Sequence, residues 1–239
     1  MQKFLVNMVS GLIFSKEKRQ RFRNKFQSAN LMGHTLKGMN NEIFLVKKDG
    51  GLKKISKFTY LGVELIVKGN NNKVYIADDI KIFDSKIEIH GNNCEIEIKD
   101  TPHVIRDVKV KLMHDKSSLK IGNDFACNEA EFIVGGKSII IGNDCMFSWN
   151  IFFMNNDYHT IVDKNTDEIL NPPKDIIIGN HVWVGNGVSV LKGAKIGNDS
   201  IVGSRSVVTK SFEEDNLIVA GMPAKIVKKD INWKREPNF

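Results

Sequence analysis

Aliphatic residues recur every six positions towards the C-terminal end of the chain, and a small or polar residue follows most of them, as in IGNH, VGNG and IGND. The series consists of Ile178, Val184, Val190, Ile196, Val202 and Val208. Six is neither the period of an α-helix nor the alternation of a simple strand. It fits a short strand followed by a tight corner, with one aliphatic side chain turned inward on each face and Gly, Asn or Asp in the left-handed conformation at the corner. Three such faces make one coil of eighteen residues, which is the spacing between Ile178 and Ile196.

The same rhythm continues upstream with looser spacing. The stretches KGMNNEIFL (37–45), KGNNNKVYI (68–76), HGNNCEIEI (90–98), KSSLKIG and GKSIIIG repeat one corner and one strand. Their isoleucines Ile76, Ile98, Ile121 and Ile141 follow one another by 22, 23 and 20 residues, close to one coil with small corner insertions. Asparagines stacked at such corners can form hydrogen bonds along the solenoid axis. An ordinary β-sandwich is the alternative, and the unbroken hexads disfavour it.

The composition limits the class of protein. Apolar residues make up 41% of the 239 residues and charged residues 26%, as in ordinary soluble proteins. The longest apolar stretch, 4–14, is too short to span a bilayer and lacks a cleavage site of the secretory type. Cys94, Cys127 and Cys145 have no metal-type spacing, which favours a reduced, cytoplasmic protein. The net charge of +7 indicates contact with a polyanion, such as a phosphate-bearing cofactor, an acidic glycan, nucleic acid or anionic lipid.

Residues 69–232 resemble the hexapeptide-repeat acyltransferases, most densely in IIIGNHVWVGNGVSVLKGAKIGNDSIVGSRSVVTKSF and IVAGMPAKIVKKDINW. The arrangement DYHTI…ILN…IIIGNHVWVG is similar to bacterial enzymes that O-acetylate capsule, O-antigen or sialic acid residues. The resemblance implies an all-β solenoid, a left-handed parallel β-helix, which is an exception to the usual right-handed crossover. We expect this β-helix over residues 37–210, between an N-terminal helical segment (1–36) and a C-terminal cap and tail (211–239). The family also implies a homotrimer.

The segment NNDYHTIVDKNTDEILNPPKD, residues 155–175, breaks the rhythm. After Ile141 the next regular coil would begin near residue 159, but the IGN signature returns only at Ile178, so about one coil of sequence is inserted. A solenoid sheds such an insertion sideways, and long loops on rigid scaffolds tend to carry function. We therefore expect an excursion loop here. In the family this excursion carries the catalytic histidine and reaches towards a neighbouring subunit.

The resemblance makes His159 the general base. Attack of a sugar hydroxyl on a thioester requires loss of the hydroxyl proton, and an imidazole suits that task near neutral pH. The acetyl group can pass directly from coenzyme A, so no nucleophilic residue is needed. Asp157, Asp163 and Glu168 are candidates for orienting the imidazole, and the sequence does not choose among them. The alternative, an ordinary surface histidine, is disfavoured because His159 precedes Trp183 as in the family. The other histidines lack this context: His34, His90, His103, His114 and His181.

Trp183 precedes the inward-facing Val184, so its side chain should point outward, where it could pack on a sugar ring or on the pantetheine arm. Asn128, in FACNEAE, resembles a substrate-contacting asparagine of related sugar acetyltransferases. Ser148 and Asn150 are rival candidates one coil nearer.

Coenzyme A requires an extended groove for pantetheine and a basic end for its phosphates. The positions that match the family's groove are Gly185, Asn186, Gly203, Ser204, Thr209, Lys210, Lys225 and Lys228. Lysine at the last two positions, where arginine is common, keeps the charge but loses bidentate geometry. The alternative is that these lysines are solvated surface charges.

Together these features predict a cytoplasmic, trimeric O-acetyltransferase that uses acetyl-CoA and a saccharide acceptor, without a metal ion or nucleic acid. An N-acetyltransferase acting on an amino-sugar nucleotide would use the same base and groove. A γ-type carbonic anhydrase needs three zinc-binding histidines, and His159 and His181, 22 residues apart, do not supply that pattern. A non-catalytic solenoid would have no use for a histidine-bearing loop. The basic N-terminal stretch leaves open a peripheral membrane contact, although a helix that caps the first coil is favoured.

Overall fold

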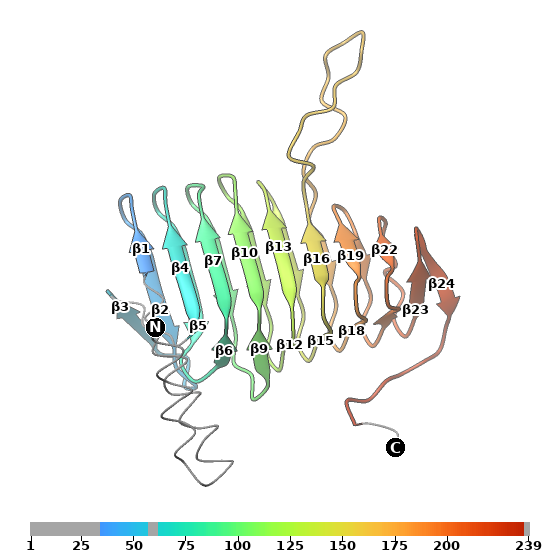
Figure 1. Cartoon of the computed structure of the whole chain (residues 1–239), viewed down its shortest axis with the longest axis horizontal. Helices are drawn as coiled ribbons and strands as arrows, with labels where there is room; N and C mark the ends of the chain where they lie inside the picture. The colour runs from blue at the N-terminus through green and yellow to red at the C-terminus, as the bar shows by residue number, and fades with distance from the viewer. Residues whose placement is uncertain (1–33, 57–61, 237–239) are drawn as a thin grey trace, which may run out of the picture.

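The computed structural model describes residues 34–56 and 62–236, which form an all-β solenoid of three eight-stranded sheets (Figure 1). Except at the two ends of the solenoid, consecutive strands step from sheet A to sheet B to sheet C, so that a complete coil adds one strand to each sheet. The expected N-terminal helical segment lies outside the described residues except for its last three, which form strand β1. The left-handed sense of the coil stays a prediction from the family resemblance.

The strands are short and their bounds follow the hexad pattern. Sheet A contains β1 (His34–Leu36), β4 (Val63–Val67), β7 (Ser85–Ile89), β10 (Val108–Leu112), β13 (Ala130–Val134), β16 (Ile151–Met154), β19 (Ser189–Leu191) and β22 (Val207–Val208). Sheet B contains β2 (Glu42–Val46), β3 (Leu52–Ile55), β5 (Lys73–Ala77), β8 (Glu95–Ile98), β11 (Ser118–Ile121), β14 (Ser138–Ile141), β17 (Ile176–Ile178) and β20 (Lys195–Ile196). Sheet C contains β6 (Lys81–Phe83), β9 (Val104–Arg106), β12 (Ala126–Cys127), β15 (Met146–Phe147), β18 (Trp183–Val184), β21 (Ile201–Val202), β23 (Ile218–Gly221) and β24 (Ala224–Lys228).

The core is a set of aliphatic columns, one on the inner face of each sheet. On sheet B, Ile76, Ile98, Ile121, Ile141 and Ile178 stand in register on successive parallel strands. Each is at most 2% exposed, and burying an aliphatic side chain of this size contributes about 1.5–3 kcal/mol. The alignment predicted from their sequence spacing is therefore confirmed, and so is the inward orientation of the six hexad residues from Ile178 to Val208.

Phenylalanines fill the core in the coils that carry the interruption. Phe147 makes an edge contact with Phe125 at 5.0 Å between ring centroids and stacks on Phe153 at 5.4 Å. Phe153 also stacks on Phe132 at 4.9 Å. All four rings are fully buried. The scaffold below the excursion loop is thus densely packed and rigid.

Asparagine ladders hold the corners together. At the corner between sheets B and C, the backbone N–H groups of Asn123, Asn143 and Asn180 each donate to the side-chain oxygen of the asparagine one coil further on, at 2.8–2.9 Å. Asn198 continues the ladder to Asp215 at 2.7 Å. The residue after each ladder residue has a positive φ, between 52° and 60°. The stacked asparagines and left-handed corners predicted from the sequence are confirmed.

Two departures from regular coiling lie in the C-terminal half of the solenoid. Residues 155–175 leave the solenoid between β16 and β17 and project sideways as a long arm (Figure 1). At the C-terminal end, β23 pairs in parallel with β21 while β24 folds back antiparallel to β23. The turn at Met222–Pro223 therefore ends the parallel stacking of the solenoid. Among the described residues, no helix is long and apolar enough to cross a membrane.

Candidate active site

The excursion loop leaves the solenoid through two buried asparagines. Asn155 is fully buried, and its Oδ1 accepts a 2.7 Å hydrogen bond from the N–H of Gly135 on the preceding coil. Its carbonyl oxygen accepts from the N–H of Lys174, so both ends of the loop are tied together. Asn156, 5% exposed, accepts from the N–H of Tyr158 through Oδ1 at 3.0 Å. The loop therefore begins from a fixed base.

His159 follows a tight turn and is exposed to solvent. Its N–H donates to the carbonyl of Asp157 at 2.6 Å, across Tyr158, which has a φ of 60°. This backbone conformation is uncommon for a bulky residue. The carbonyl of His159 accepts from Nδ2 of Asn171 at 2.9 Å. The backbone of His159 is thus held on both sides while its imidazole stays open to an acceptor.

The carboxylate nearest to His159 in sequence is held by other groups. Asp157 accepts hydrogen bonds from Nζ of Lys192 and, at 2.8 Å, from Nδ2 of Asn171. The Lys192 bond first and the Asn171 bond second hold the pKa of Asp157 below its ordinary value. Asp157 therefore stays ionised and tied to the solenoid.

The other two candidate carboxylates lie further out on the arm. Asp163 accepts from the N–H groups of Asn165 and Thr166 at 2.8 and 2.9 Å, and these bonds lower its pKa. Glu168 accepts from the N–H of Asp163 through its backbone carbonyl. Within residues 34–56 and 62–236, none of the three candidate carboxylates forms a hydrogen bond or ion pair with the imidazole of His159.

Most of the predicted substrate and cofactor residues gather on one edge of the solenoid, the corner between sheets C and A. That edge carries Asn128, Ser148, Asn150, Gly185, Asn186, Gly203 and Ser204. Backbone bonds stack its successive coils, from the N–H of Ser148 to Val184 at 3.0 Å and from Arg205 to Asn186 at 2.7 Å. The sequence alone did not show that the predicted substrate residues and the predicted cofactor residues share an edge.

Glycines keep the coils of this edge in close contact. A Cβ atom on Gly185 would lie 2.8 Å from the backbone nitrogen of Ser204. One on Gly203 would lie 2.8 Å from Cβ of Ala220. Neither position has room for a side chain, so glycine is needed at both for the coils to stack this closely.

The remaining predicted cofactor residues lie elsewhere. Thr209 and Lys210 follow β22 at the corner between sheets A and B, where the ammonium of Lys210 lies 5.4 Å from the centroid of the Phe212 ring. Lys225 and Lys228 are exposed on the edge strand β24. The structure therefore does not bring all the predicted cofactor residues onto one edge within a single chain.

Trp183 points outward from sheet C between Met146 and Ile201, as predicted, and is 37% exposed. One side of its indole faces Trp233 at 6.1 Å between ring centroids. Among the described residues, no group of three or more His, Cys, Asp or Glu is arranged to hold a metal ion.

Comparison with known proteins identifies the family. The family model for the bacterial transferase hexapeptide (six repeats) matches residues 175–210. A polysialic acid O-acetyltransferase of Neisseria meningitidis is 42% identical over 178 residues, which are 72% of this chain and 80% of the relative. The chain is a hexapeptide-repeat O-acetyltransferase.

Solved structures support this assignment. The crystal structure of the polysialic acid O-acetyltransferase OatWY superposes on this O-acetyltransferase with a TM-score of 0.70 and 35% identity, covering 85% of this chain and 92% of that one. The polySia-specific acetyltransferase NeuO gives a TM-score of 0.70 at 29% identity, with 86% and 90% coverage.

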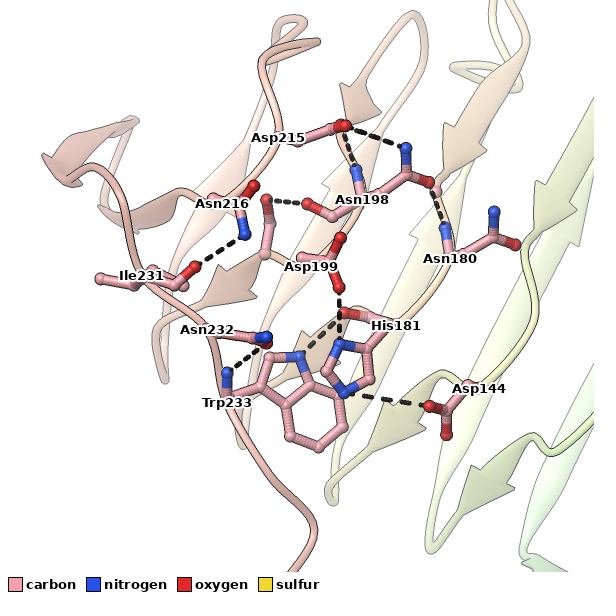
Figure 2. Close-up of polar contacts among 12 residues, drawn as sticks. Asp144, Asn180, His181, Asn198, Asp199, Asp215, Asn216, Ile231, Asn232 and Trp233 are labelled. Carbon is pink, nitrogen blue, oxygen red and sulfur yellow. Dashed lines mark hydrogen bonds and ion pairs between the residues drawn. The ribbon is translucent and has the colours of Figure 1, made fainter.

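Sequence reasoning predicted the C-terminal tail of this O-acetyltransferase but missed its course, which runs back over the corner between sheets B and C (Figure 2). Trp233, 6% exposed, donates from Nε1 to the carbonyl of His181 at 2.8 Å. The imidazole of His181 lies 2.9 Å from Asp199, and Arg235 donates to Asp144 at 2.9 Å. The available signal was a tryptophan in a basic tail opposite a corner lined with aspartates.

Proposed function

We propose that this protein transfers the acetyl group of acetyl-CoA to a hydroxyl of a bacterial capsule polysaccharide, with His159 as general base. The observation that carries the proposal is the 42% identity to a polysialic acid O-acetyltransferase over 80% of that protein's length. The position of His159 agrees with it, because an exposed imidazole on a firmly held backbone can reach a large acceptor.

The chemistry needs no residue that is acylated. His159 takes the hydroxyl proton while the acceptor oxygen bonds to the thioester carbonyl carbon. The resulting oxyanion collapses, the carbon–sulfur bond breaks, and the imidazolium of His159 returns the proton to the departing thiolate. Histidine performs both transfers because it gains and loses a proton near neutral pH.

The edge between sheets C and A is our candidate for the coenzyme A groove. Gly185 and Gly203 let its coils stack closely, and the partly exposed Asn186 and exposed Ser204 beside them offer polar groups to a flexible arm carrying amides. Trp183 supplies an outward-facing aromatic surface for the pantetheine arm or a sugar ring. Lys225 and Lys228 on β24 provide exposed positive charge for the phosphates.

We further propose that the active enzyme is a homotrimer. Four apolar residues of the projecting arm are 41–58% exposed: Ile161, Val162, Ile169 and Leu170. A second copy of the chain would bury them, and closed symmetry would repeat the contact around the trimer. The same contact would carry His159 to the neighbouring subunit. Cytoplasmic location stays a prediction, and a membrane contact of the N-terminal segment stays the alternative to the favoured capping helix.

The deciding experiment offers the protein acetyl-CoA with a panel of acceptors. The panel contains polysialic acid, uncharged capsule polysaccharides and nucleotide-linked amino sugars, and mass spectrometry reads the products. We expect an acetyl ester on a polysaccharide, which mild base removes. A base-stable amide on an amino-sugar nucleotide, without any polysaccharide ester, would replace this proposal with N-acetylation.

A further inference from the structure

We infer that Asn171, Asp157 and Lys192 form a clamp that positions the catalytic histidine, so that Asn171 and Lys192 are positioning residues for acetyl transfer. The inference rests on the proposed role of His159 as the base. It assigns the positioning of His159 to Asn171, on the returning half of the excursion loop, and to Lys192, on the next coil.

Asn171 is the centre of the clamp. Its Nδ2 donates to the carbonyl of His159 at 2.9 Å and to Oδ2 of Asp157 at 2.8 Å. Its Oδ1 accepts from the N–H of Ile161 at 2.6 Å. An amide carries two N–H donors and one carbonyl acceptor, so a single side chain satisfies the backbone on both sides of Thr160. An aspartate here would lose both donors and repel Asp157.

Lys192 anchors the clamp to the solenoid. It follows β19 directly, and its side chain is 21% exposed. Nζ forms a hydrogen-bonded ion pair with Asp157 and donates to the carbonyl of Asn171 at 3.1 Å. Charge-assisted hydrogen bonds of this kind are stronger than neutral ones. Lys192 thereby contacts both halves of the loop from a coil that is fixed by core packing.

The contacts converge on one residue of the loop. The N–H of His159 donates to the carbonyl of Asp157, and its own carbonyl accepts from Asn171. Both partners are members of the clamp. Asp163, at the outer turn, instead accepts hydrogen bonds from the N–H groups of Asn165 and Thr166. A role limited to folding the loop would not require the anchors to meet at His159. A general base needs such placement, because an error of about 1 Å can cost roughly 100-fold in rate.

The test compares Asn171→Ala and Lys192→Met with the native enzyme. We expect kcat to fall roughly 10- to 100-fold in each, while the KM for acetyl-CoA changes less than about twofold, since the clamp does not form the proposed groove. Lys192→Arg should recover most of the turnover. The acidic limb of the kcat/KM profile should persist because His159 is still present. Asn165→Ala makes the same change at the outer turn and should leave kcat unchanged.

A combined Asn171→Ala/Lys192→Met variant tests whether the two residues act as one unit. The double variant should then lose little more than the more damaged single variant, whereas multiplied losses would mean separate roles. Native kcat in both single variants, with His159→Ala inactive, would overturn the clamp but keep the base. A large fall in the Tm of the single variants would show that the clamp stabilises the fold and does not position His159. An active His159→Ala would instead remove the proposed function itself.

Discussion

The indole of Trp233 lies flat on the imidazole of His181, with 4.3 Å between ring centroids and 10° between ring planes (Figure 2). The two residues are 52 positions apart, and the contact joins the C-terminal tail to the coil that bears Trp183. Arg235 extends the tail to Asp144 on the preceding coil. Because each coil of a solenoid otherwise contacts only its neighbours, a strap across several coils adds long-range connection.

Replacing Trp233 by alanine should destabilise the protein. The change removes a ring that is 6% exposed and its hydrogen bond to His181. We expect a loss of about 2–4 kcal/mol in the free energy of unfolding, near the lower part of the range for buried aromatic residues because the tail can detach. Chemical denaturation measures the loss. Lys234→Ala, an exposed neighbour, should cost less than about 0.5 kcal/mol. Equal stability of both variants would show that the strap does not support the coils.

Much of the fold could be predicted because each coil must turn one aliphatic residue inward on each face. Because of that requirement, isoleucines separated by about one coil in the sequence stand side by side on neighbouring strands, as Ile76, Ile98 and Ile121 do. Counting from Ile141 to Ile178 located the excursion loop, and alternation set the outward direction of Trp183. These predictions depend only on local periodicity.

Other features could not be predicted because they depend on where distant segments meet. The bond between Lys192 and Asp157 forms only because the loop returns to the corner that it left. His181 stands at a left-handed corner position where other coils have aspartate. Nothing in the hexad pattern indicates that its imidazole stacks on Trp233, which lies far away in the sequence. Strand β3 folds back on β2 after a tight turn, which the hexad pattern does not contain.

The cysteines should be inert in the folded protein. Burial raises the pKa of Cys127 and of Cys145 to about 12, whereas an unfolded thiol titrates near about 8.5. A thiol-specific disulfide reagent at pH 8 should find no reactive thiol before denaturation and three afterwards. Rapid labelling of the native protein would show that the core opens readily.

The same burial predicts a pH dependence of stability with a definite sign. Below about pH 8.5 both states hold the thiol protons, and the contribution of the neutral thiols is fully present. From there to about pH 12 the unfolded state releases protons that the folded state retains, so the free energy of unfolding falls. The variant Cys127→Ala/Cys145→Ala should show a shallower alkaline decline. An unchanged slope would assign the decline to other groups.

Lys225→Ala should raise the KM for acetyl-CoA more than it lowers kcat. A phosphate contact stabilises ground state and transition state alike, so its loss appears in binding. Lys210→Ala tests the other predicted contact, whose ammonium lies above Phe212 at a different corner. Lys120→Ala, on the outer face of sheet B beside Glu95, is the matched control. If KM is unchanged in the first two variants, the phosphates bind elsewhere.

Charge on the projecting arm should disrupt the proposed trimer. Ile169 and Leu170 are 58% and 57% exposed in one chain. An aspartate in place of either would put an unpaired charge into an apolar contact, which is costly. Ile169→Asp/Leu170→Asp should therefore elute as a smaller species in size-exclusion chromatography with light scattering, and should lose turnover. Lys164→Asp, on the same arm, should stay trimeric. A native enzyme that is a fully active monomer would exclude sites shared between subunits.

His159 carries the proposed chemistry, and its replacement by alanine is the sharpest test. Without a base, kcat should fall by roughly two to four orders of magnitude, and the acidic limb of the kcat/KM profile should disappear. Binding of acetyl-CoA should survive, because the proposed groove lies on the coils. The side chain is exposed, so the free energy of unfolding should change by less than about 0.5 kcal/mol. His103→Ala, the same change at another corner, should keep native turnover. If His159→Ala also turns over at the native rate, another group accepts the proton and the loop serves acceptor binding or assembly instead.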